Sequence, residues 1–183
     1  MGIILMKYKN ELIKSMSFLG KKKDTVFIGQ SVSYSGNAIY NTLTGVPLNK
    51  KIEMPVFEDV QMGISIGMAL NGFVVISCFP RFDFLICAMN QLVNHLDKIR
   101  QMSRGEMKPK VLIRTSIGSK APLDGGPQHT QNYTNEMKKI LNEIKVVFLD
   151  KPKMIFPAFK KAYEDKDSYS YLFVEHGDFY NQK

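Results

Sequence analysis

Two residues of the sequence have side chains suited to acid–base chemistry, and both follow apolar segments. Glu58 comes, together with Asp59, directly after residues 54–57, and His129 lies in a Gly/Pro-rich segment, residues 125–130. Carboxyl and imidazole groups are common proton-transfer groups in enzymes. Each residue also has a simpler interpretation. Acids in a first helical turn complement the helix dipole, and a lone loop histidine is often merely solvated.

Three phenylalanines, Phe79, Phe82 and Phe84, follow an apolar segment that ends at Cys78. Aromatic side chains at such a place usually belong to the core, but they can also stack on a flat ligand. The sequence has no phosphate-binding P-loop, no Gly-x-Gly-x-x-Gly segment, no Cys/His spacing for zinc and no serine nucleophile elbow. We therefore predict no metal site in this chain and no diphosphate-binding loop of its own.

An alternating series of helices and strands must position these residues. Apolar spacing predicts helices over residues 8–19, 58–70, 82–102, 133–144 and 154–163. Short apolar runs predict strands over residues 25–29, 73–78, 111–115, 146–149 and 171–174. These runs lack polar–apolar alternation, which is typical of strands buried on both faces of a parallel sheet. We predict an α/β fold, a three-layer sandwich in which helices cover a mainly parallel sheet, in a single domain of residues 1–183.

Ligands of such folds bind beyond the carboxyl ends of the strands. The predicted loops there are residues 30–51, 79–83 and 116–130, and the last of them contains His129. An irregular stretch as long as residues 30–51 is often functional in a compact domain.

The charge balance and the cysteines limit the classes of function. The chain of 183 residues has 25 basic and 17 acidic residues, a net charge of +8. The densest basic stretch, residues 100–120, contains no aromatic residue to stack on bases, which disfavours nucleic-acid binding. No apolar run reaches the roughly 18–20 residues that cross a bilayer. Cys78 and Cys87 both have apolar neighbours in sequence, so we predict two buried thiols in a cytoplasmic protein.

Several blocks, in order along the chain, resemble one known family. Residues 54–69, Met-Pro-Val-Phe-Glu followed by Met-Gly-Ile-Ser-Ile-Gly-Met-Ala, resemble its Thr-Pro-Ile-x-Glu…Gly-x-Ala-x-Gly-x-Ala block. Residues 82–84, 90–95 and 98–103 resemble its next helix, and residues 114–115 with 126–131 resemble its Arg-Thr…Gln-His-Ser-Gln block. This family is the transketolase-like pyrimidine-binding domain of thiamine diphosphate enzymes. The closest form is the β subunit of the first component of 2-oxo acid dehydrogenases, such as that for pyruvate.

The resemblance implies a role for each matching residue. Glu58 would hydrogen-bond the aminopyrimidine ring of thiamine diphosphate and promote the tautomer that activates the cofactor, and His129 would face the substrate or the acyl acceptor. Phe84 would pack on the pyrimidine, with Val56 and Phe82 as wall residues. The diphosphate and magnesium would be held by an α-type partner subunit, in a homodimer or heterotetramer. The chain would then be an enzyme subunit, inactive alone, acting on a 2-oxo acid with decarboxylation and acyl or aldehyde transfer.

Two departures from the family pattern leave alternatives open. The segment Gly29-Gln30-Ser31-Val32 stands where the family's β subunit has a Gly-Glu-Glu-like segment, so a proton link between paired sites is in question. The printed sequence also ends at Lys183, where the family usually begins a C-terminal domain. A split thiamine diphosphate lyase, decarboxylase or transketolase-like enzyme is one alternative. A catalytically degenerate interaction module is another, but the presence of both Glu58 and His129 argues against it.

Overall fold

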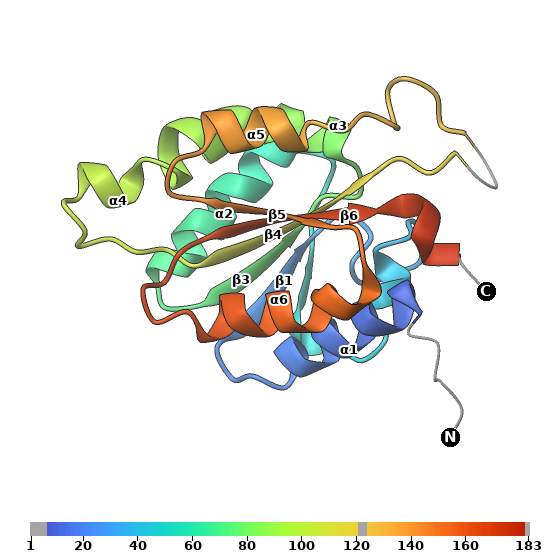
Figure 1. The fold of residues 1–183 in the computed structure, drawn as a ribbon. Helices are drawn as coiled ribbons and strands as arrows, with labels where there is room; N and C mark the ends of the chain where they lie inside the picture. Colours follow the sequence, from blue (N-terminus) through green and yellow to red (C-terminus); the bar gives the residue numbers. More distant parts are fainter. Residues whose placement is uncertain (1–6, 121–123, 182–183) are drawn as a thin grey trace.

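The computed structural model describes residues 7–120 and 124–181, and its centre is an open sheet of six parallel strands (Figure 1). The strand order is β2-β1-β3-β4-β6-β5. The strands are β1 (Thr25–Gly29), β2 (Lys51–Glu53), β3 (Val74–Cys78), β4 (Val111–Ile117), β5 (Lys145–Leu149) and β6 (Tyr171–His176). Every residue of β1, β3 and β4 is buried, as expected for strands covered on both faces. The predicted α/β sandwich is therefore confirmed.

Helices cover the two faces of the sheet in two layers (Figure 1). One face is covered by α1 (Tyr8–Gly20) and α6 (Pro152–Glu164), whose apolar residues form one core cluster with the inward side chains of the sheet. The other face is covered by α2 (Glu58–Leu70), the segment from α3 (Phe82–Leu85) to α4 (Ile99–Met102), and α5 (Thr134–Ile140). Short 3₁₀ turns occur at Tyr40–Thr42, Leu48–Lys50, Ile86–Ala88 and Gly177–Asn181. Among the described residues, none of the helices combines the length and apolarity needed to cross a membrane.

The expected long helix over residues 82–102 is not one regular helix, and the prediction was wrong there. The chain passes from α3 through a 3₁₀ turn into a π-helix, Asn90–Leu96, before α4 begins. The Asp97 N–H donates to the carbonyl of Leu92, five residues earlier, at 3.0 Å. A regular α-helix would connect residues four apart, so the wider turn sets the direction in which Asp97 leaves the helix.

The same aspartate explains why α5 ends at Ile140 rather than at the expected residue 144. The Asp97 side chain is fully buried, and its Oδ1 accepts the backbone N–H groups of Asn142, Glu143 and Ile144 at 2.9, 2.9 and 3.2 Å. Burial opposes its charge, but the hydrogen bonds from Lys98 and these N–H groups lower the pKa of Asp97. A carboxylate held in this way stops the helix and turns the chain into β5.

Three other expectations need correction. Residues 51–53, expected to lie in a loop, form the edge strand β2, and β4 and β6 continue to Ile117 and His176. Cys87, expected to be buried, is exposed, because it lies on the outer side of the 3₁₀ turn that interrupts the helix. Cys78 is buried as expected, and burial raises the pKa of its thiol to about 11.

Candidate functional site

A cavity of about 310 Å³ lies where loops follow the carboxyl ends of β1, β3, β4 and β6. In parallel sheets this edge is where ligands bind. The segment after β1 contributes Gln30, the turn after β3 contributes Arg81 and Phe84, and the long loop after β4 contributes His129. The other lining residues are Ser31, Gly36, Asn37, Ala38, Pro80, Ser116, Ser119, Gly177 and Tyr180. Residues that are far apart in the sequence thus share one polar cavity.

Glu58 begins α2, and its side chain is connected to this cavity through Gln30. Only 8 % of Glu58 is exposed, and its Oε1 accepts a hydrogen bond from the Gln30 amide at 2.9 Å. Among the described residues, none donates a hydrogen bond to Glu58 Oε2, so that oxygen is available to a ligand. Asp59, the next residue, has a different partner: its Oδ2 accepts a hydrogen bond from the Gln91 side-chain amide at 3.4 Å. The two neighbouring acids therefore have different surroundings.

Gln30 is held in place by the loop that follows it. Its carbonyl accepts the Asn37 side-chain amide at 3.0 Å. The carboxylate of Glu53, at the end of β2, accepts the backbone N–H groups of Ser31, Val32 and Ser33. A carboxylate that accepts several N–H groups fixes a loop firmly. This use of Glu53 was not foreseen from the sequence, because β2 itself was not.

Phe84 and His129 meet at the cavity wall. Their rings contact edge to face, with centroids 5.4 Å apart and planes at 84°. The Nδ1 atom of His129 is buried and, among the described residues, has no hydrogen-bond partner. A Cβ atom at Gly125 would stand 2.6 Å from the His129 Cβ, so only glycine fits there. The loop thereby brings the imidazole close to an aromatic ring, with its Nδ1 side packed near Gly125.

The structure does not bring the other two predicted wall residues to the cavity. Val56 is 79 % exposed and lies outside the cavity lining. Phe82 is fully buried, where its ring contacts the edge of Tyr133 at 5.6 Å between centroids. Of the predicted site residues, Phe84 and His129 therefore line the cavity, and Glu58 is connected to it through one hydrogen bond.

The remaining histidines lie apart from this group. His95 is exposed, and its Nδ1 lies 3.3 Å from the Asn90 carbonyl, in agreement with a structural or surface role. His176 ends β6, and its ring stacks on Phe179 at 4.1 Å. Among residues 7–120 and 124–181, no group of three or more His, Cys, Asp or Glu side chains is placed to hold a metal ion.

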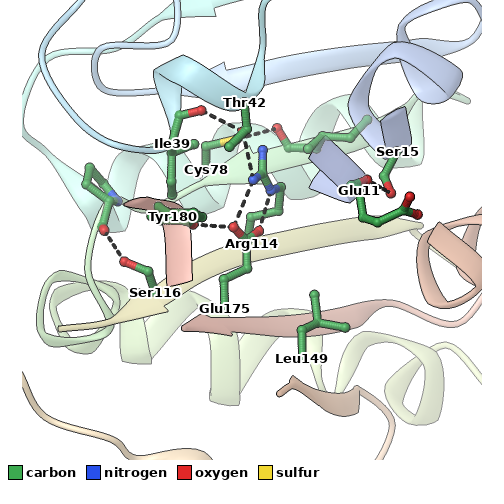
Figure 2. Close-up of polar contacts among 12 residues, drawn as sticks. Glu11, Ser15, Ile39, Thr42, Cys78, Arg114, Ser116, Leu149, Glu175 and Tyr180 are labelled. Carbon is green, nitrogen blue, oxygen red and sulfur yellow. Dashed lines mark hydrogen bonds and ion pairs between the residues drawn. The ribbon is translucent and has the colours of Figure 1, made fainter. Parts of the chain in front are cut away.

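A buried ion pair beneath the cavity was not predicted from the sequence (Figure 2). Arg114 of β4 donates from Nε and Nη2 to the two carboxylate oxygens of Glu175 of β6, at 2.6 and 2.9 Å. Both side chains are fully buried. Arg114 also donates to Thr42 at 3.0 Å, and the Tyr180 hydroxyl donates to Glu175.

This network ties the cavity wall to the sheet. Thr42 belongs to the loop after β1, and Tyr180 lines the cavity itself. Burial opposes the charge on Arg114, but the Glu175 carboxylate holds its pKa above the ordinary value. Burial and the same carboxylate raise the pKa of Tyr180. A charged Arg114 directly after the apolar run Val111-Leu112-Ile113 was the sequence signal that could have indicated a buried partner.

Comparisons with known proteins identify a matching family and several similar proteins. The family described as "Transketolase, pyrimidine binding domain" matches residues 13–181. The "Pyruvate dehydrogenase E1 component subunit beta" of Rickettsia conorii is 31 % identical over 117 residues, 62 % of this chain and 35 % of that protein. The "3-methyl-2-oxobutanoate dehydrogenase subunit beta" of Mycobacterium tuberculosis is 33 % identical over 82 residues, 44 % of this chain and 24 % of that one. The mitochondrial "Pyruvate dehydrogenase E1 component subunit beta" of Saccharomyces cerevisiae is 28 % identical over 120 residues, which are 63 % of this chain and 32 % of that protein.

These matches therefore span about a third or less of each curated relative. A solved structure titled "Split gene transketolase, inactive beta4 tetramer" has a TM-score of 0.60 and 16 % identity, covering 93 % of this chain and 51 % of that one. At that identity the likeness concerns the fold alone. Because the family match covers nearly all of the described residues, the chain belongs to the transketolase pyrimidine-binding domain family.

Proposed function

We propose that this chain is the pyrimidine-binding, β-type subunit of a heteromeric thiamine diphosphate enzyme acting on a 2-oxo acid such as pyruvate. The observation that carries the proposal is the grouping of Glu58, Gln30, Phe84 and His129 at one end of the sheet. A ring with hydrogen-bonding nitrogens needs a carboxyl partner beside a flat apolar surface, and Glu58 Oε2 and Phe84 offer both. When bound, thiamine diphosphate supplies a carbon nucleophile for the 2-oxo acid carbonyl and an electron sink after CO₂ leaves.

Glu58 and His129 would then have different roles in proton transfer. Glu58 would hold or give a proton at a pyrimidine ring nitrogen through Oε2, while the Gln30 amide keeps Oε1 in place. A carboxyl that is 8 % exposed is shielded from water, which strengthens such a bond. His129 would exchange a proton with the substrate or acceptor, since its side chain lines the cavity.

A partner subunit that holds the diphosphate and magnesium is part of the proposal, because the role proposed for this chain concerns the pyrimidine ring alone. An exposed apolar surface beside Glu58 supports an interface there. Val56 and Phe57 are 79 % and 57 % exposed, and Val60 and Ile64 continue the same side of α2 at helical spacing. We therefore expect the chain alone to be inactive and to bind thiamine diphosphate poorly. The substrate class follows the curated relatives, which are named for pyruvate and 3-methyl-2-oxobutanoate.

The proposal is tested by exchange of the thiazolium proton in deuterated buffer, followed by NMR on the complex of this chain with its diphosphate-binding partner. Glu58→Gln keeps the shape of the side chain but removes the carboxyl group. We expect exchange to slow by roughly 10²–10⁴-fold, the usual contribution of a positioned acid–base group. Asp59→Asn is the matched control, because it removes the adjacent acid of the same helical turn and should leave the rate unchanged.

Exchange at the wild-type rate in Glu58→Gln would contradict the proposal and favour a catalytically degenerate interaction module. Calorimetry on the isolated chain provides a second check. Micromolar binding of thiamine diphosphate and magnesium without any partner would show that the proposed division between two subunits is wrong.

A further inference from the structure

The cavity contains a cation for which the proposed chemistry has no use. Arg81 follows β3, is partly buried and lines the cavity together with Phe84 and His129. Among the described residues, none forms an ion pair or a side-chain hydrogen bond with its guanidinium. Partly buried charges in proteins are ordinarily paired, because loss of water around an ion is costly. The guanidinium of Arg81 is therefore free to bind a ligand in the cavity.

The rest of the lining makes an anion the matching partner. None of the residues that line the cavity is an aspartate or a glutamate. Glu58 is absent from the lining, and its Oε1 is bonded to Gln30. The uncharged polar groups around Arg81 include the Ser119 hydroxyl and the His129 ring, both of which can donate to an oxyanion. One cation and several donors with no acid among them attract negative charge into a concave space.

The backbone that carries Arg81 is well fixed. The carbonyl of Pro80 accepts the hydroxyl of the buried Ser116 at 2.8 Å, and the N–H of Phe79 donates to the Arg114 carbonyl at 2.8 Å. The Arg81 carbonyl accepts the N–H groups of Phe84 and Leu85 at 3.2 and 3.3 Å. A side chain on so rigid a turn loses less freedom when it binds a ligand, which favours its use as a binding group.

We propose that Arg81 makes this cavity a binding site for an oxyanion, a carboxylate or phosphate group. Guanidinium groups recognise both through paired N–H donors. The assignment to a substrate rests on the proposed function: the 2-oxo acid or the acceptor then carries a negatively charged group that lies beside Phe84 and His129. Arg81 is a determinant of specificity in this proposal, and anion binding itself does not depend on the identity of the reaction.

The experiment titrates the full chain with sodium phosphate, sodium acetate and, at matched ionic strength, sodium chloride. Binding is followed by NMR at the arginine Nε–H and histidine ring signals. We expect saturable shifts of Arg81 and His129 with phosphate, acetate or both, and none with chloride. The anion with the higher affinity, phosphate or acetate, identifies the bound group as a phosphate or a carboxylate.

Three variants make the test specific. Arg81→Gln should weaken anion binding by roughly 10-fold or more, the change ordinarily associated with a hydrogen bond to a charged group. Arg81→Lys should retain part of the affinity because it keeps the charge. Arg104→Gln is the matched control, since Arg104 is exposed and follows α4 at the opposite end of the sheet (Figure 1).

Equal affinities in the wild type and Arg81→Gln would overturn the inference, as would the absence of any saturable shift. Equal weakening by Arg104→Gln would also overturn it, because the effect would then reflect only the net charge of +8. The proposed function fails separately, through the Glu58→Gln exchange experiment. Anion binding that depends on Arg81 in a chain whose Glu58 has no catalytic effect would leave this inference standing and remove only its assignment to a 2-oxo acid or an acyl acceptor.

Discussion

Replacing Glu175 with glutamine should destabilise the protein more than almost any other single isosteric change. The substitution leaves the fully buried Arg114 guanidinium without a counter-charge. Thr42 would remain as a neutral partner, while Nη1 already has none among the described residues. Breaking a buried pair by removing one charge typically costs about 3–5 kcal/mol. Since whole domains have unfolding free energies of roughly 5–15 kcal/mol, the variant should fold but unfold at much lower urea concentration.

The measurement is urea unfolding followed by circular dichroism, with wild type, Glu175→Gln, Arg114→Met and the double variant Arg114→Met/Glu175→Leu. The free energy of unfolding should fall less in the double variant than in either single variant, because the double variant leaves no unpaired charge in the core. Glu143→Gln is the matched control. The Glu143 carboxylate lies 4.0 Å from Arg100, and both side chains are partly exposed, so the expected loss is about 0–1 kcal/mol.

Two results would refute this reasoning. A Glu175→Gln variant no less stable than Glu143→Gln would mean that water reaches Arg114 and replaces the lost carboxylate. The second is a double variant whose loss of unfolding free energy equals the sum of the losses in the two single variants. It would mean that the contacts with Thr42 and Tyr180, rather than the charge pair, account for the stability.

Three further predictions follow from the described side chains. A thiol reagent should modify one cysteine per native chain, and Cys87→Ser should abolish the reaction, because Cys78 is buried with its pKa raised to about 11. Burial opposes the charge of Asp165, but hydrogen bonds from Lys145 and Tyr171 hold its pKa at about 2, below the ordinary 3.8. The stabilisation is thus complete above about pH 4 and lost as the pH falls through about 2, and urea denaturation of Asp165→Asn across that range should show a weaker acid dependence. Without a partner the chain should self-associate through the exposed side of α2, and Ile64→Lys should shift it toward monomer in light scattering.

The core strands and most helices could be predicted from the sequence. Their apolar residues are numerous enough that only one secondary structure buries them all. Residues 25–29 and 58–70 are examples, and the structure places β1 and α2 there. The strand β2 could not be predicted, since it is three residues long and its central Ile52 is 37 % exposed. The break in residues 82–102 places Asp97 beside N–H groups that lie 45–47 residues later in the chain. Such distant hydrogen bonds leave no local pattern.

The candidate site was foreseen in part. Phe84 and His129 were proposed from motif blocks, and the structure brings their rings together. Val56 and Phe82 were proposed in the same way, but their exposure depends on the exact direction of each turn, which spacing does not specify. Gln30 and Arg81 were not proposed as site residues, because their significance depends on what faces them across the cavity.

Gln30 gives Glu58 a neutral hydrogen-bond partner at the edge of the cavity. The resemblance described above would place acids in this segment, and here an amide donates to Glu58 Oε1 at 2.9 Å. An amide NH₂ group donates at every pH, whereas a carboxylate at position 30 could donate only when protonated. The amide therefore fixes the orientation of Glu58 without competing for its proton, and it cannot pass a proton onward to another carboxyl group. In the proposed function, such a site would keep Glu58 as its acid–base residue and would have no proton link through residue 30.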